Sequence, residues 1–236
     1  MKTLIVGAGQ VGTALKEVLQ KCNEVHIKDL GDYPLRGVKV MHVCYPDQPG
    51  FVKTTKKYIK QYKPGLTIIN SSVSIGTTRK CGNDVVYSPV RGRHPALAQE
   101  MTMFTKYCGS LDVKKSLKAA LYFKRSGWRD VGAVASPDSL EYLKLMSNVH
   151  MGLEVAWRQE VERMMKRFKI DPQNYTAWEE SYSEGYRKLE QWHMMRSIMS
   201  PGPIGGHCIL PCTDILKSQF KSKAFDFILE SNSKSQ

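Results

Sequence analysis

Three glycines near the N-terminus have the spacing of a phosphate-binding turn. Gly7, Gly9 and Gly12 directly follow the β-rich run Lys2–Val6 and open an amphipathic helical pattern. The first glycine permits a tight turn, the second lets backbone approach a pyrophosphate, and the third lets the helix pack closely on the strand. The start of the helix adds partial positive charge. The pattern therefore predicts a bound dinucleotide, and a glycine-rich turn that binds nothing is the alternative.

An acidic residue lies about 20 residues after the glycines, at the end of the second predicted strand. The carboxylate of Asp29 would accept hydrogen bonds from the hydroxyls of the adenosine ribose, which disfavours the extra phosphate of NADP. The neighbouring Lys28 weakens that argument. We predict NAD as the cofactor. The residues expected to bind it are Gly7, Gly9, Gln10, Val11, Gly12, Asp29, Tyr45 and Pro46.

A lysine and an asparagine stand four residues apart in a long helical pattern. Lys144 and Asn148 would leave one face of the helix a turn apart, so an ammonium and an amide could hold the same substrate oxygen. The ammonium could stabilise an alkoxide during hydride transfer, or exchange a proton with it. The alternative is an ordinary solvated lysine on an amphipathic helix.

A cysteine follows two glycines in the C-terminal part of the chain. Cys208 ends the run Gly205-Gly206-His207-Cys208, which comes after the helix-breaking Pro201-Gly202-Pro203. A thiol on such a constrained loop is a candidate nucleophile, and a nearby cation would favour its thiolate. A buried cysteine that only packs is the alternative. Zinc is not expected, because His207, Cys208 and Cys212 have no evident fourth ligand and match no common spacing.

Three segments resemble the UDP-glucose/GDP-mannose dehydrogenase family. Asn70–Thr78 resembles the family's S-T-V-P-V-G-T-T loop, and Pro203–Ile209 resembles its G-x-G-G-H-C-I loop. Lys144 to Asn148 resembles its K-x-x-x-N pair, and the order of the three segments is also that of the family. The resemblance implies that Ser72 stands where a catalytic threonine hydroxyl lies, and that Cys208, Lys144 and Asn148 are catalytic.

The chain departs from this family in its predicted substrate loops. The family's S/N-P-E-F-L-x-E segment corresponds to Ser88–Pro95, where Val90 replaces the first glutamate and two arginines make the loop basic. The family's C-I-P-x-D run is also altered. We expect a small anionic substrate, bound by Arg91, Arg93, Gly205, Gly206 and His207. A solvated basic loop is the alternative. These departures favour a single hydride transfer over a four-electron oxidation.

The elements that must position these residues alternate along the N-terminal half. Strand-like runs are predicted at Lys2–Val6, Glu24–Ile27, Val38–Cys44, Leu66–Ile69, Val85–Tyr87 and Phe104–Cys108, with helices to about Lys21, at Phe51–Tyr62 and at Val113–Phe123. This alternation predicts an α/β fold with a Rossmann-type parallel sheet. We expect this NAD-binding domain to span residues 1–135.

The pattern becomes helical after about residue 136. Ser136-Pro137 is a helix start, and no proline interrupts the apolar spacing before Pro172, so one long central helix of about 30 residues is predicted. Further helices are predicted at Pro172–Leu189 and Ile215–Leu229, after a loop over Ser200–Leu210. The predicted second domain, residues 136–236, is thus all-helical.

Composition limits the classes of partner. The 236 residues carry 35 Lys and Arg against 22 Asp and Glu, a net charge of +13 that suits anionic ligands. No nucleic-acid-binding motif accompanies the charge, so nucleic acid is not an expected partner. No apolar run reaches the about 18 residues of a membrane span, and no signal peptide is apparent. We expect a cytoplasmic protein with reduced cysteines, and a homodimer that covers the methionine-rich long helix.

Three hypotheses about function follow. The first is an NAD-dependent oxidoreductase of the UDP-glucose/GDP-mannose dehydrogenase type, in a short two-domain form, that transfers hydride between the nicotinamide and an alcohol carbon. The second is a reductase of the β-hydroxyacid type without covalent catalysis. That wider superfamily, which includes the 6-phosphogluconate dehydrogenases, shares the first domain, the serine-bearing loop and the K-x-x-x-N helix but lacks the cysteine loop. The third is a non-catalytic sensor that binds NAD and contacts a partner.

Overall fold

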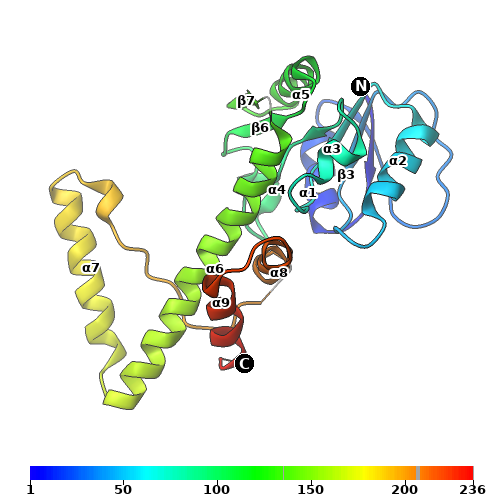
Figure 1. Ribbon diagram of the computed structural model, residues 1–236. Coiled ribbons are helices and arrows are strands. Elements are labelled where there is room, and N and C mark those ends of the chain that lie inside the picture. The colour runs from blue at the N-terminus through cyan, green and yellow to red at the C-terminus, as the bar shows by residue number, and fades with distance from the viewer. Residues whose placement is uncertain (135, 206–207, 236) are drawn as a thin grey trace. The chain divides into compact units, whose positions relative to one another are not determined.

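A seven-stranded sheet forms the centre of the N-terminal half in the computed structural model, which describes residues 1–134, 136–205 and 208–235 (Figure 1). The chain divides into two units, Met1–Lys144 and Leu145–Gln236. The helix α6 (Pro137–Phe168) crosses this division. The domain boundary between residues 135 and 136 stays a prediction.

The strands run in the order β2-β1-β3-β4-β5-β6-β7. Their bounds are β1 (Lys2–Val6), β2 (Glu24–Lys28), β3 (Val40–Val43), β4 (Leu66–Ile69), β5 (Val86–Tyr87), β6 (Lys106–Gly109) and β7 (Val131–Val134). The first five strands pair in parallel, so their carboxyl ends lie at one edge of the sheet. The predicted Rossmann-type sheet is confirmed.

One pair in the sheet departs from the predicted parallel arrangement. Strand β6 is antiparallel to β5 through Tyr87 and Gly109, and β7 then follows β6 in parallel. A parallel neighbour needs a crossover connection, usually a helix. Between β5 and β6 the described chain contains only the four-residue helix α4 (Leu97–Glu100), whereas the full helix α5 (Val113–Arg125) joins β6 to β7.

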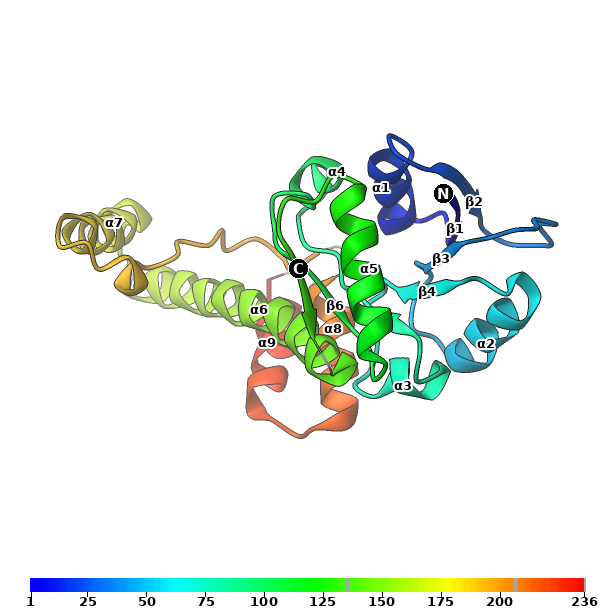
Figure 2. The same ribbon diagram turned by 90° about the horizontal axis from the view of Figure 1, so that it is seen from above.

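Helices cover both faces of the sheet (Figure 2). The helix α1 (Gln10–Leu19), α4 and α5 pack on the face that carries Ile5 and Ile68. The helices α2 (Phe51–Tyr62) and α3 (Thr77–Cys81) pack on the face that carries Leu4 and Ile69. Because successive strand residues point to opposite faces, a strand buried on both sides is mostly apolar, as β1, β3 and β4 are apart from the buried Thr3, His42 and Thr67.

Three short elements were not predicted. The strand β7 and the helices α3 and α4 have four, five and four residues. A helical period cannot be recognised over a single turn, and the Val-Gly-Ala-Val sequence of β7 is a weak strand signal. Of the six predicted strands, Lys2–Val6 and Leu66–Ile69 have the observed bounds, and the bounds of the other four differ by one or two residues, as is usual at element ends.

A buried polar network ties four strands and α5 together near the carboxyl edge. The imidazole of His42 is bonded through Nδ1 to Asn70 Oδ1 at 2.8 Å and through Nε2 to Tyr122 Oη at 3.1 Å. Asn70 Nδ2 donates to the carbonyl of Ser88 at 2.6 Å. The buried ammonium of Lys106 donates to the same carbonyl at 3.1 Å. Complete burial lowers the pKa of His42 to about 3, so the imidazole is neutral.

The described residues of the C-terminal unit form helices and no strand. The helix α6 has 32 residues, which confirms the predicted long central helix. The helix α7 (Pro172–Lys188) begins at its proline, with Asp171 accepting a hydrogen bond from the amide of Gln173. The remaining elements are the short 3₁₀ turn η1 (Trp192–Met194), α8 (Ile209–Gln219) and α9 (Lys223–Ser233).

The prediction of a single helix over Ile215–Leu229 was wrong, because the structure has two helices, α8 and α9, in this part of the chain. The helix α8 ends at Gln219, Phe220 is extended, and the hydroxyl of Ser222 caps α9 by accepting from the amide of Ala224 at 3.2 Å. The apolar spacing continues across this break, which hid the cap. The loop predicted over Ser200–Leu210 is also shorter than expected, because α8 begins at Ile209 and accommodates Pro211 in its first turn. Among the described helices, none is long and apolar enough to cross a membrane.

The buried His42 makes stability depend on pH. A folded-state pKa of about 3 lies below the usual value of about 6.5, so between these pH values the unfolded chain binds a proton that the folded chain does not. We expect the free energy of unfolding to fall by about 2–3 kcal/mol between pH 6.5 and 4.5. Urea unfolding followed by tryptophan fluorescence measures this. His42→Gln, which does not titrate, should remove most of the slope, and an unchanged slope would contradict the assignment.

Candidate functional site

Two of the three glycines are required by the packing of the chain itself. Gly7 has φ +107°, and a Cβ there would lie 2.7 Å from the backbone nitrogen of Tyr45. A Cβ on Gly12 would lie 1.9 Å from the carbonyl oxygen of Gly7. The backbone of this turn therefore lies so close to the residues after β3 and to the first turn of α1 that only glycine fits at these two positions.

Gly9 is not required by the packing of the chain. It is the N-terminal flanking residue of α1 with an ordinary φ of −72°, and no atom lies within 4 Å of a Cβ built on it. Its lack of a side chain also leaves the start of α1 without a side-chain cap. The amides of the first turn, which include those of Gln10 and Val11, have no carbonyl partner within the helix. The open space at Gly9, next to such amides, suits an anionic group.

Asp29 and Lys28 have different environments at the end of β2. The carboxylate of Asp29 is exposed and accepts a hydrogen bond from the amide of Ala8 at 3.3 Å, so it lies beside the glycine turn. Lys28 is only 4% exposed. Its ammonium donates to the carbonyl of Asp29 at 2.9 Å and to Tyr58 Oη at 3.3 Å. Lys28 is thus turned inward, and the carboxylate faces solvent.

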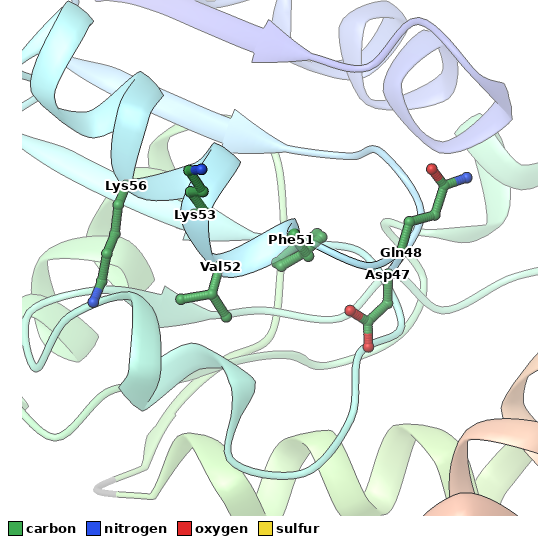
Figure 3. Close-up of a pocket in the computed structure, with 7 residues that line it drawn as sticks. Asp47, Gln48, Phe51, Val52, Lys53 and Lys56 are labelled. Carbon is green, nitrogen blue, oxygen red and sulfur yellow. The ribbon is translucent and has the colours of Figure 1, made fainter.

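The turn from β3 into α2 carries the next predicted residues. The hydroxyl of Tyr45 is hydrogen-bonded to Thr55 Oγ1 at 2.6 Å, and burial raises the pKa of Tyr45. Pro46 is exposed. The residues that follow Pro46 in the sequence line a cavity of about 570 Å³ (Figure 3). Its lining residues are Asp47, Gln48, Gly50, Phe51, Val52, Lys53 and Lys56.

The segment that follows β4, residues 70–78, is held at several points, and we call it the serine loop. The hydroxyl of Ser71 donates to the carbonyl of Tyr45 at 2.6 Å. The amide and hydroxyl of Ser74 both donate to Asp47 Oδ2, at 2.9 and 3.0 Å. The half-buried Ser72 lies between them, and its hydroxyl makes no hydrogen bond with the described residues. Ser72 is therefore available to a ligand.

The first turns of α6 add a carboxylate and an ammonium. Glu141 is fully buried and accepts hydrogen bonds from the amides of Gly76 and Thr78 at 2.6 and 2.8 Å. Burial raises the pKa of Glu141 despite these donors. Lys144 is half-buried three residues further along the helix. Burial lowers the pKa of Lys106 to about 8, and the charge of Lys144 contributes to the same shift.

The C-terminal unit brings together two of the predicted catalytic residues. Asn148 Nδ2 lies 3.5 Å from the carbonyl oxygen of Cys208 and 3.1 Å from Cys212 Sγ. Cys208 is exposed immediately before α8, whereas Cys212 is buried one turn later. The predicted substrate residue Gly205 is exposed. The predicted substrate residues Gly206 and His207 lie outside the described residues.

The predicted basic substrate loop is partly neutralised by its own chain. The amide and guanidinium of Arg93 donate to the carboxylate of Glu100, at 2.8 and 3.3 Å. The guanidinium of Arg91 lies over the ring of Phe104 at 5.0 Å. Val90, which replaces the glutamate of the resembled family, is buried and packs in the core. Binding of an anionic substrate by Arg91 and Arg93 stays a prediction.

The sequence analysis did not single out Asp47, Glu141 or Lys106, and it considered Cys212 only as a zinc ligand. Glu141 stands three residues before Lys144 on the same face of a helix, a spacing that could have pointed to it. The described residues contain no group of His, Cys, Asp and Glu side chains that could hold a metal ion. The cysteines are free, and Cys44, Cys81, Cys108 and Cys212 are buried while Cys22 and Cys208 are exposed.

Comparison with known proteins gives structural neighbours but no sequence match. No protein-family model and no curated protein sequence matches the chain. All of the chain aligns with a UDP-D-ManNAc dehydrogenase from Pyrococcus horikoshii, with a TM-score of 0.78 and 16% identity over 69% of that protein. A UDP-glucose dehydrogenase from Pyrobaculum islandicum matches 99% of the chain, with a TM-score of 0.72 and 15% identity over 68% of its own length.

The chain shares the fold of these dehydrogenases. It also aligns over 99% of its length with a 3-hydroxyisobutyrate dehydrogenase from Mycobacterium tuberculosis, with a TM-score of 0.64 and 12% identity. The alignment covers 92% of that shorter protein. The resemblance inferred from the three motifs is thus confirmed at the level of the fold. The chain spans about two thirds of the sugar-nucleotide dehydrogenases, whose substrates and chemistry belong to those longer proteins.

The glycine turn offers a matched pair of substitutions. Gly12→Ala should destabilise the fold by at least about 2 kcal/mol, because the new methyl group overlaps the carbonyl of Gly7. Gly9→Ala meets open space, so we expect a loss of less than about 1 kcal/mol but NADH binding weaker by about tenfold or more. Thermal unfolding and NADH fluorescence titration measure the two effects. Unchanged NADH affinity in Gly9→Ala would show that no ligand uses this space.

Proposed function

We propose that this protein is an NAD-dependent oxidoreductase that acts on an alcohol carbon of a small anionic or sugar-nucleotide-like substrate. The observation that carries the proposal is the open space at Gly9, where α1 begins with uncapped amides and the packing of the chain does not need a glycine. The shared fold of the dehydrogenases supports it.

The end of β2 supports NAD rather than NADP. The exposed carboxylate of Asp29 lies beside the glycine turn, where it can accept hydrogen bonds from a ribose and would repel a phosphate. Lys28 could have offset this repulsion, but its ammonium is buried and committed to Asp29 and Tyr58. No other basic side chain directly adjoins Asp29 in the sequence.

The catalytic roles follow from the side chains. Bound NAD would supply the hydride acceptor. Lys144 and Asn148, four residues apart on α6, hold the substrate oxygen, and the ammonium stabilises the negative charge that develops on it. The hydroxyl of Ser72 donates a further hydrogen bond to the substrate. Cys208 is exposed and can add to a carbonyl carbon as a thiolate.

The proposal is limited to one hydride transfer. A four-electron oxidation would need a group that activates water for hydrolysis of a thioester. The resembled enzymes use glutamates there, and this chain has the buried Val90 at the first of those positions. The basic side chains nearby, Arg91 and Arg93, would instead meet an anionic substrate.

A reductase of the β-hydroxyacid type is the second candidate, and one observation favours it. The chain aligns over 99% of its length with a 3-hydroxyisobutyrate dehydrogenase, with a TM-score of 0.64. In that case Cys208 has no covalent role. Turnover of UDP-glucose, UDP-N-acetylmannosamine and 3-hydroxyisobutyrate, followed by NADH absorbance, separates the two candidates. Cys208→Ser should lower turnover only if the thiolate adds to the carbonyl product.

We also propose a homodimer. Large apolar side chains of the C-terminal unit are exposed, including Phe168 at 70%, Trp178 at 63% and Leu189 at 65%. Exposed apolar groups in this number suit a contact with a second copy of the chain. A monomer by light scattering at micromolar concentration would contradict this part of the proposal.

Substitution of the lysine tests the catalytic assignment. We expect Lys144→Ala to lower kcat by about 1000-fold or more, because the charge that stabilises the alkoxide is lost. NADH binding should stay nearly unchanged, because Lys144 is not among the residues of the glycine turn. The matched control is Lys166→Ala on the same helix, where the lysine is exposed and paired with Glu162. Equal loss of turnover and NADH binding in Lys144→Ala would argue against a catalytic lysine.

A further inference from the structure

The buried carboxylate of Glu141 joins two segments that each carry a proposed catalytic residue. It belongs to α6, and its three hydrogen-bond donors belong to Gly76 and Thr78, at the end of the serine loop where α3 begins. Oε2 accepts from the amide of Gly76 at 2.6 Å. Oε1 accepts from the amide and hydroxyl of Thr78, at 2.8 and 2.6 Å. Such short bonds to an acidic side chain are among the stronger contacts that a chain can make.

Burial of the Glu141 carboxylate costs free energy unless its oxygens accept hydrogen bonds. Glu141 is fully buried, and Thr78 is fully buried as well. A buried carboxylate is tolerated when hydrogen-bond donors satisfy its lone pairs. Loss of one donor leaves a buried oxygen without its hydrogen bond, which destabilises the folded state. The contact between α6 and the serine loop therefore has one favourable geometry, and small displacements of either segment are opposed.

The same helix carries Lys144 and Asn148. Glu141, Lys144 and Asn148 are spaced i, i+3 and i+7, so they follow one another along one stripe of a helix that continues without a break. At the other end of the contact, Ser72 stands four residues before Gly76 in the serine loop. Because α6 is continuous and the serine loop is held by several hydrogen bonds, the contact at Glu141 fixes where Lys144 and Ser72 lie.

We propose that Glu141 is a positioning residue that fixes the ammonium of Lys144 relative to the hydroxyl of Ser72. This inference rests on the proposed function for its catalytic meaning. Glu141 takes no part in the chemistry, because both carboxylate oxygens are occupied by backbone and threonine donors. Its effect is on orientation, and misplacement of a reacting group by about 1 Å can lower a rate by about 100-fold.

A second contact between the same two helices provides the matched control. The guanidinium of Arg79 in α3 pairs with Asp138 Oδ2 in α6 at 3.2 Å, with the arginine side chain 55% exposed. The Asp138 side chain is 26% exposed, and a partly exposed ion pair contributes less than a fully buried contact. Arg79→Gln therefore removes a link between the same elements without disturbing the buried one.

The test compares Glu141→Gln with Arg79→Gln. In Glu141→Gln the amide oxygen can still serve Thr78, but the amide nitrogen then faces the amide of Gly76, and two donors meet. We expect hydrogen–deuterium exchange of the peptide 73–80 to accelerate by about tenfold or more, because the loop opens more easily. We expect kcat with the best of the three probe substrates to fall by about 10- to 100-fold, with KM and the NADH Kd nearly unchanged. Arg79→Gln should change none of these.

Thr78 provides a second test from the other side of the contact, should Glu141→Gln fold poorly. Thr78→Val removes only the hydroxyl donor and should lower kcat, and Thr78→Ser should restore it. The inference is overturned if peptide 73–80 exchanges at the wild-type rate in Glu141→Gln, if Arg79→Gln has an equal effect, or if kcat falls only as the folded fraction falls. If the wild type turns over none of the probes, the proposed function fails, and the exchange rates still decide whether Glu141 fixes the loop.

Discussion

The close approach of Gly12 to the carbonyl of Gly7 is the constraint on which the rest of the site depends. A Cβ at Gly12 would stand 1.9 Å from that oxygen, so α1 can begin immediately after β1 only with glycine there. This contact directs the N-terminus of α1 to the carboxyl edge of the sheet and leaves open space at Gly9. Parallel pairing of β1 to β5 then delivers Asp29, Tyr45 and the serine loop to the same edge.

Hydrogen bonds between polar side chains hold the residues at the carboxyl edge of the sheet in place. His42 and Asn70 join neighbouring strands beneath the edge, and Asp47 and Glu141 hold the serine loop from two sides. Each of these groups is bonded to the chain, whereas the hydroxyl of Ser72 makes no hydrogen bond with the residues that the structure describes. A loop held by fixed groups, with one side chain left to a ligand, fits the active site that we propose.

The sequence predicted those parts of the site that depend on local geometry. The long helix that carries Lys144 and Asn148 follows from the apolar period, and the structure has the helix as expected. The catalytic roles of the two residues stay predictions. Glu141 and Lys106 were missed, because a charged residue on an amphipathic element is ordinarily solvated, and only tertiary contacts bury it. The break between α8 and α9 was missed because the apolar spacing continues across the cap at Ser222. The antiparallel direction of β6 depends on how a long connection folds back, which no local pattern shows.

A crystal structure of the protein grown with NADH tests the central claim most directly. The account predicts the pyrophosphate in the space at Gly9, with a ribose on Asp29 and the nicotinamide beside Ser72 and Lys144. Crystals grown at saturating NADH that show no dinucleotide at Gly9, or a nicotinamide turned away from Ser72 and Lys144, would contradict it.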